Sequence, residues 1–169
     1  MRAFAKSILT SIIAVIVIML FTNLVFFFPW YMTLVVETFN VTQYVASDNY
    51  LKDTYYDDTK ERLEKRPIFS RKANGIEIVA EHEDHHSARG YDDFSYYDNE
   101  DIPDADKPYR QRGESVIVTI SAIYPLSVKL WGETYEREIP VSFTLKTTGL
   151  KHYKDLEYKE YLKNWNGQP

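Results

Sequence analysis

The feature that most constrains this chain is a run of 30 residues without a charged side chain, from Ser7 to Val36. As a helix with a rise of about 1.5 Å per residue, this window would be roughly 45 Å long. The hydrocarbon core of a bilayer is only ~30 Å thick, so the window is long enough to cross it with both ends in the interface. The sequence therefore predicts a transmembrane helix at the N-terminus.

The length and the C-terminal end of this window are those of an uncleaved membrane anchor. Its apolar core covers residues 8–28, which exceeds the about 7 to 15 residues of a signal peptide, and no Ala-x-Ala-like cleavage site follows. Pro29 and Trp30 come next, where an interfacial aromatic belt is expected. We expect residues 1–30 to form a cytoplasmic tip and a signal anchor in the cell membrane. Because Arg2 and Lys6 precede the apolar core, the N-terminus should be cytoplasmic and the C-terminal domain extracellular.

Asn23 is the most polar side chain inside this span. A single-pass anchor tolerates one amide near its outer third, but an amide in hydrocarbon also gains by pairing with an amide of another helix. Both interpretations stay open at this point. The span holds no ionisable group, which argues against ion or proton transport.

Composition excludes several classes of protein. The chain has no cysteine, so a disulfide scaffold, a thiolate zinc site and a cysteine nucleophile are ruled out. Without Arg2 and Lys6, 18 basic residues face 25 acidic ones, a net charge of −7. Nucleic-acid binding needs a basic surface and is not expected.

Residues 31–66 contain neither Gly nor Pro and show helical spacing. The apolar positions form two adjacent seams; the first contains Leu34, Val41 and Val45, and the second contains Val35, Phe39, Ala46 and Tyr50. This pattern predicts an extracytoplasmic stalk helix, continuous with the anchor or kinked at Pro29, that ends before Pro67. β-Branched and aromatic residues weaken the helical propensity, so a break near residues 47–49 is also compatible.

Residues 67–169 are predicted to form a small β-rich domain. Alternating apolar residues predict strands at 76–81, 115–124 and 134–148, with a short continuation to residue 130 and a turn at 131–133. The polar stretch 82–113 reads as a long acidic loop. The fold class is therefore α+β, a long N-terminal transmembrane helix extending into a stalk helix and followed by a small antiparallel β-sheet unit.

Two polar clusters are candidate binding sites. His82, His85 and His86 lie among three carboxylates, a composition that suits zinc or nickel, but the spacing lacks the helical pair of a zinc motif. Residues 91–106 hold seven carboxylates and no basic residue, yet the spacing of a calcium loop is missing. We expect a solvated histidine loop and a disordered or partner-docking acidic loop, with no bound metal and no cofactor.

Catalytic motifs are not found either. The six glycines all lie at or after Gly75, and no phosphate-cradling loop, nucleophile elbow or paired catalytic carboxylates can be recognised. We therefore expect a non-enzymatic protein. The alternative to a structural role is a signal-anchored extracytoplasmic binding or sensor module that uses the His and acidic loop.

The order of elements resembles that of pilin-like proteins. The segment GESVIVTISAIYPLSVKLWGETYEREIPVSFTLKTTGLKHYKDLEY, residues 113–158, is similar to the C-terminal half of Tad-type pseudopilin-like proteins of Gram-positive secretion or conjugation systems. The chain departs from pilin precursors in two ways: no Gly precedes the apolar helix, and no Glu follows five residues into it.

The resemblance implies an assembly subunit of a pilus, secretion or conjugation apparatus. Its partners would be the lipid bilayer and other pilin-like subunits or membrane platform proteins, and it would oligomerise through the N-terminal helix. The residues expected to pack in the membrane or against a neighbouring helix are Asn23, Pro29, Trp30, Leu34, Val35, Phe39, Val41 and Val45.

Overall fold

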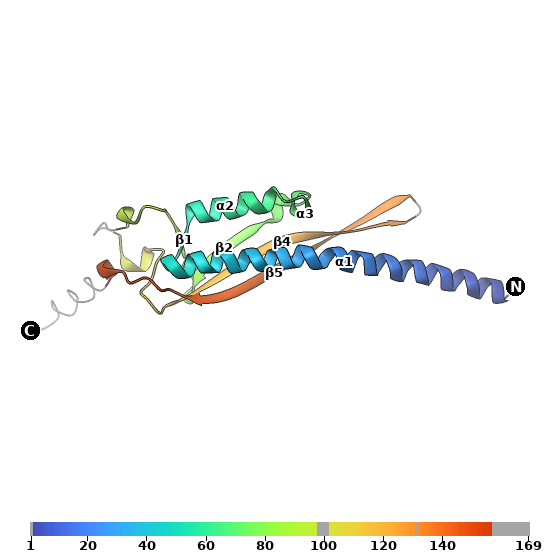
Figure 1. The fold of residues 1–169 in the computed structure, drawn as a ribbon, viewed down its shortest axis with the longest axis horizontal. Coiled ribbons are helices and arrows are strands. Elements are labelled where there is room, and N and C mark those ends of the chain that lie inside the picture. The colour runs from blue at the N-terminus through green and yellow to red at the C-terminus, as the bar shows by residue number, and fades with distance from the viewer. Residues whose placement is uncertain (1, 98–101, 131, 157–169) are drawn as a thin grey trace, which may run out of the picture.

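The computed structural model describes residues 2–97, 102–130 and 132–156 (Figure 1). It confirms the α+β class: a long N-terminal helix is followed by a small antiparallel sheet. The helices and strands are α1 (Arg2–Asp48), β1 (Leu51–Lys52), α2 (Asp53–Glu64), α3 (Pro67–Ser70), β2 (Glu77–His82), β3 (Arg89–Gly90), β4 (Ser115–Leu130) and β5 (Glu133–Thr148). Three short 3-10 helices lie at Ala73–Gly75, Phe94–Tyr96 and Asp104–Asp106.

Helix α1 is one element of 47 residues that continues through Pro29. Its N-terminal part extends beyond the rest of the protein, and its C-terminal part lies along the sheet (Figure 1). The polar side chains of the window bond back to their own helix: the Thr22 hydroxyl donates to the Ile18 carbonyl at 2.9 Å, and the Asn23 amide donates to the Met19 carbonyl at 3.0 Å. Within this chain, the amide of Asn23 is therefore satisfied locally, as a single-pass anchor allows.

The predicted single stalk helix over residues 31–66 is wrong. Helix α1 ends at Asp48, and α2 runs back alongside it (Figure 1). The break falls where the sequence left one open, because Asn49 adopts the left-handed conformation with φ 61° and ends the helix. Stacking of Tyr44 on Tyr55, with ring centroids 4.4 Å apart, joins the two helices just after the reversal.

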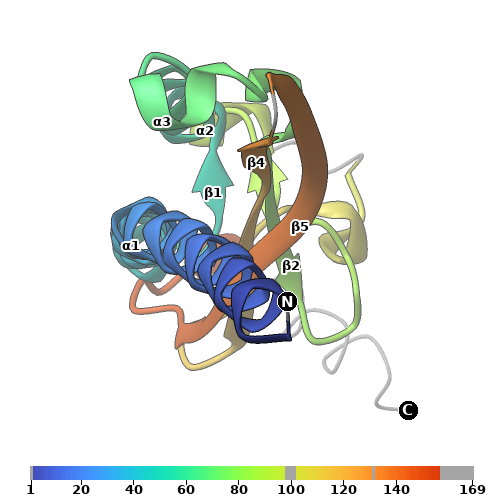
Figure 2. The same ribbon diagram turned by 90° about the vertical axis from the view of Figure 1, so that its right-hand side faces the viewer.

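The antiparallel sheet has the order β2-β4-β5. In β4, Ile120 pairs with Ile78 of β2 and with Phe143 of β5, so the central strand is flanked on both sides along its first half. The helices cover one face of the sheet (Figure 2). Alternate residues of β4 from Val116 to Tyr124 are buried there.

One hydrophobic core joins the three predicted regions, residues 1–30, 31–66 and 67–169. It combines Trp30 of the predicted anchor, Leu34 and Val41 of the predicted stalk, and Ile120 of the sheet. The C-terminal half of α1 is therefore part of the folded domain, because its buried face supplies one wall of that core.

The β4–β5 hairpin has the predicted continuation, since β4 reaches Leu130 and β5 begins at Glu133. Pro125 does not end β4, which continues to Leu130, because β2 pairs with β4 only as far as Ser121. Beyond that point no strand among the described residues pairs with this edge of β4, and a proline without an N–H is tolerated there. The distal half of the hairpin rises away from α1 in both views (Figures 1 and 2).

Candidate functional site

An exposed apolar seam runs along α1 from the charge-free window into the folded domain. Its members alternate in steps of four and three residues, the 3.5-residue period of helices that pack side by side. They are Phe21, Val25, Phe28, Met32, Val35 and Phe39. Phe28, Met32 and Phe39 are 64%, 41% and 53% exposed, and Val35 is half-buried. We call these six residues the exposed seam.

The opposite face of α1 is used within the chain. Leu34, Val41 and Val45 are fully buried against the sheet, and Trp30 is buried as well. The sequence assigned both apolar seams to contacts with a neighbour, and for the first seam this is wrong. Its side chains are enclosed by their own domain, so they cannot reach a second molecule.

The remaining predicted packing residues are divided between the two sides. Pro29 and Phe39 are exposed, Val35 is half-buried, and Asn23 is half-buried beside the sheet. Of the predicted residues beyond the anchor, Val35 and Phe39 are thus the two that remain available to a partner.

Glu37, the first charge after the window, is 1% exposed. Its carboxylate lies 2.7 Å from the Arg66 guanidinium and 3.3 Å from that of Arg62. Arg62 lies in the last turn of α2, and Arg66 lies between α2 and α3, so the ion pairs fix the end of α2 on α1. This role could not be predicted from the sequence, because Glu37 lies far from both arginines along the chain and meets them only after the reversal at Asn49.

An aromatic cluster holds the end of the charge-free window. The ring centroid of Tyr124 lies 5.0 Å from that of Phe27 and 5.2 Å from that of Trp30. The ring centroids of Trp30 and Phe69 are 5.0 Å apart. The Tyr124 hydroxyl donates to the Asn23 carbonyl at 3.2 Å. The sheet therefore contacts the helix within the window itself, and not only beyond it.

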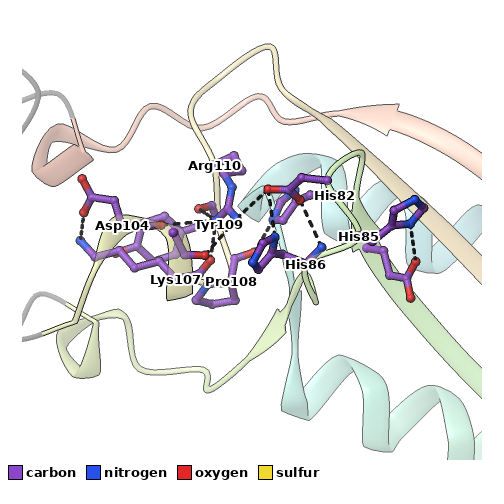
Figure 3. A network of polar contacts seen from close by, with 11 residues as sticks. His82, His85, His86, Asp104, Lys107, Pro108, Tyr109 and Arg110 are labelled. Atoms are coloured by element: carbon purple, nitrogen blue, oxygen red, sulfur yellow. Dashed lines mark hydrogen bonds and ion pairs between the residues drawn. The ribbon is translucent and has the colours of Figure 1, made fainter.

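The three histidines of the predicted cluster have separate partners (Figure 3). His82 is buried, with Nε2 2.8 Å from the carbonyl oxygen of Pro108. Burial lowers the pKa of His82, although the Pro108 contact opposes the shift. His85 and His86 are exposed beside Glu81 and Asp84, respectively. Within the described ranges, no group of three or more His, Cys, Asp or Glu side chains is placed to hold a metal ion.

Part of the predicted acidic loop, including Asp98, Glu100 and Asp101, lies outside the described residues. Elsewhere in the loop, carboxylates make contacts within the chain. Asp93 accepts from the backbone of Ser95 at 2.9 Å, and Asp104 lies 3.3 Å from the ammonium of Lys107. The Lys107 side chain is fully buried and also pairs with Asp155 at 2.5 Å, so the described acidic charge is partly neutralised internally.

A second buried cluster explains the aromatic residues of this loop. Tyr97 packs with Tyr50, Tyr109 and Tyr153, and the rings of Tyr109 and Tyr153 stack at 4.1 Å. Burial raises the pKa of Tyr50, Tyr109 and Tyr153, which keeps their hydroxyls neutral. The sequence predicted a disordered or partner-docking loop. Tyr97 instead packs within its own chain, while Tyr91 and Tyr96 stay exposed.

Comparisons of the chain with protein-family models, curated proteins and solved structures found no match in any of the three. Helix α1 is long and apolar enough to cross a membrane, a criterion that an N-terminal signal sequence also meets. The features that bear on function are therefore the exposed seam of α1 and the contacts of α1 with the sheet.

Proposed function

We propose that this chain is a non-enzymatic single-pass membrane subunit of a pilin-like or pseudopilin-like assembly, belonging to a pilus, secretion or conjugation apparatus. The observation that carries the proposal is the exposed seam. It continues from the charge-free window past Pro29 to Phe39, alongside the folded domain.

Lipid accounts for only the first part of this seam. The apolar core of the charge-free window, residues 8–28, supplies the about 20 apolar residues that a membrane span needs. Met32 and Phe39 lie further along, level with the ion pair of Glu37 and with the sheet. Exposed aromatic and aliphatic side chains at that level would meet water unless another protein covers them.

The spacing of the seam favours a helix as its partner. Side chains alternating in steps of four and three residues remain on one side of a helix when two helices supercoil around each other with left-handed twist. Burying each large apolar side chain contributes about 1.5–3 kcal/mol. A second copy of α1 offers the same seam and therefore the same spacing, so side-by-side packing of copies satisfies both helices.

Contacts within the window support an anchor that is kept and not cleaved. Tyr124 bonds to Asn23 and packs on Phe27. Removing the window by cleavage would cut α1 inside the segment that the sheet holds. With Arg2 and Lys6 on the cytoplasmic side, the sheet domain would lie outside the cell.

Sedimentation velocity of the full chain in a mild nonionic detergent tests this function. The wild type should form discrete oligomers, and Phe39→Glu should shift it to the monomer because a carboxylate would be buried in the seam. Tyr135→Glu is the matched control, since Tyr135 is 55% exposed on the distal hairpin and away from the seam. A wild type that is monomeric across a range of detergent concentrations, or a Phe39→Glu protein that still assembles, would refute the proposal.

A further inference from the structure

A groove with a volume of about 540 Å³ opens where the sheet domain meets the charge-free window. One wall is α1, with Asn23, Phe26 and Trp30, and the other walls are α3 with Ile68 and the distal part of β4 with Tyr124. Asn23 and Phe26 belong to the window itself. An occupant of the groove would therefore share the depth of the outer end of the membrane span.

Arg71 lines the same groove and is exposed. Its neighbours are already paired: Arg66 bonds to Glu37, and Lys72 bonds to Glu138. Across residues 2–97, 102–130 and 132–156, no hydrogen bond or ion pair engages the side chain of Arg71. The groove thus has one cation without a counter-charge at its rim.

Trp30 provides a second, independent observation. Its side chain lines the groove and is 2% exposed, yet Nε1 has no hydrogen-bond acceptor among the described residues. Buried donors in proteins are nearly always paired, and an orphaned one is costly. An acceptor oxygen placed in the groove beside this indole would remove that cost.

We propose that the groove binds one anionic phospholipid. Its phosphate would pair with the Arg71 guanidinium, an ester carbonyl oxygen would accept from Trp30 Nε1–H, and the start of an acyl chain would lie against Phe26 and Tyr124. The inference rests on the proposed membrane anchoring, because only an inserted α1 brings the groove to the lipid headgroups.

The shape of the hairpin is consistent with this occupant. The distal half of the hairpin rises away from α1 (Figures 1 and 2). The divergence leaves an opening beside α1 for one lipid, lined by Phe26 and Tyr124. Because Asn23 and Phe26 of the proposed span line the groove, lipid headgroups surround it, which is why a lipid is the favoured partner.

Native mass spectrometry of the full chain in nonionic detergent, titrated with phosphatidylglycerol or phosphatidylcholine, tests the site. We expect one bound phosphatidylglycerol, weaker binding of phosphatidylcholine, and about tenfold weaker phosphatidylglycerol binding by Arg71→Ala because a charge-assisted contact is lost. Trp30→Phe keeps an aromatic ring without the N–H and should weaken binding about threefold. Arg112→Ala is the control, since Arg112 is exposed beside the far end of α1 and should leave lipid binding unchanged.

Equal binding of both lipids, or equal binding by Arg71→Ala and Arg112→Ala, would overturn the lipid site. Displacement of the lipid by millimolar inorganic phosphate would also overturn it, by showing a simple anion site. Flotation of the wild type with vesicles separates this inference from the proposed function. A chain that floats but shows no dependence on Arg71 would still be an anchor without a lipid site, whereas a chain that does not float would refute the anchor itself.

Discussion

The Tyr124 hydroxyl lies 3.2 Å from the carbonyl oxygen of Asn23, so a strand of the sheet is hydrogen bonded to a residue inside the charge-free window. The ring of Tyr124 also packs edge-on against Phe27 at 5.0 Å. The domain is therefore joined rigidly to the proposed membrane span, without a flexible linker between them. A tilt of α1 in the bilayer would tilt the sheet with it.

Substitution of Tyr124 should separate the two effects of this contact. Tyr124→Phe removes one partly buried hydrogen bond and should lower the free energy of unfolding by about 0.5–1.5 kcal/mol. Tyr124→Ala also removes the ring and should cost about 3–5 kcal/mol. Urea unfolding of the full chain in detergent measures both. Tyr135→Phe on the exposed hairpin should change nothing, and an equal loss there would show that the contact with α1 is not the cause.

Asn49 should be critical for the reversal between α1 and α2. It has a positive φ and is buried, and its amide donates to the carbonyls of Arg110 and Lys151 at 2.8 and 2.6 Å. Asn49→Ala loses these bonds and strains the backbone, so the free energy of unfolding should fall by about 2–4 kcal/mol.

Asn49→Gly separates the two causes of that loss, the missing hydrogen bonds and the backbone strain. Glycine accepts the positive φ, so this variant should be more stable than Asn49→Ala but less stable than the wild type. Ser47→Ala is the control, because Ser47 is exposed and its hydroxyl donates to the nearby Tyr44 carbonyl. Thermal unfolding of the four proteins ranks them, and an Asn49→Ala protein as stable as Ser47→Ala would contradict this role.

Neutralising Glu37 should loosen α2 from α1. Glu37→Gln keeps the shape but removes the charge that Arg62 and Arg66 share. Both arginines are more than 40% exposed and can turn to water, so we expect a loss of about 1–2 kcal/mol, less than for a fully buried pair. Glu61→Gln, which breaks an exposed pair with Lys65, should cost under about 0.5 kcal/mol. Equal losses in urea unfolding would contradict the distinction.

His82 should make stability depend on pH. Burial lowers the pKa of His82, helped by the charge of Arg110, so the folded chain binds fewer protons than the unfolded chain near the unfolded value of about 6.5. The contribution of His82 to the free energy of unfolding is therefore present above pH ~7. It is lost as the pH falls below the unfolded pKa of about 6.5, by at most about 1.4 kcal/mol per pH unit.

Melting temperatures from pH 8 to 5 measure this dependence. His82→Gln should flatten the curve, since glutamine does not titrate and can still donate a hydrogen bond. The exposed His85→Gln should leave the curve as in the wild type. If the His85 variant flattened it and the His82 variant did not, the assignment to the buried ring would be wrong.

The sequence allowed the long helix and the three main strands to be predicted, because their apolar periods are strong. It did not allow the end of α1 to be placed, because Asn49 occupies the position where a glycine usually ends a helix. The left-handed conformation of Asn49 is fixed by packing with distant residues. Gly149 shows this dependence: a Cβ there would overlap the side chain of Asn49, 100 positions away in the sequence.

For a related reason, the sequence located the two apolar seams of α1 but not which of them is exposed to a partner. Both seams of α1 are apolar, and helical spacing alone cannot say which one the sheet covers. The structure resolves this by burying Leu34 and Val41 and leaving Phe39 exposed. The roles of Glu37 and Lys107 were not predictable, since their partners are brought close only by the folded chain.

Disulfide crosslinking in intact cells tests the proposed assembly most directly, because the chain has no native cysteine. Single cysteines at Met32 and Phe39 place a thiol in the exposed seam, while Thr33→Cys on another side of α1 and Lys60→Cys on α2 serve as controls. We predict covalent dimers on mild oxidation from the two seam positions and little from the controls. Dimers formed equally at all four positions, or at none, would contradict packing of copies through the seam.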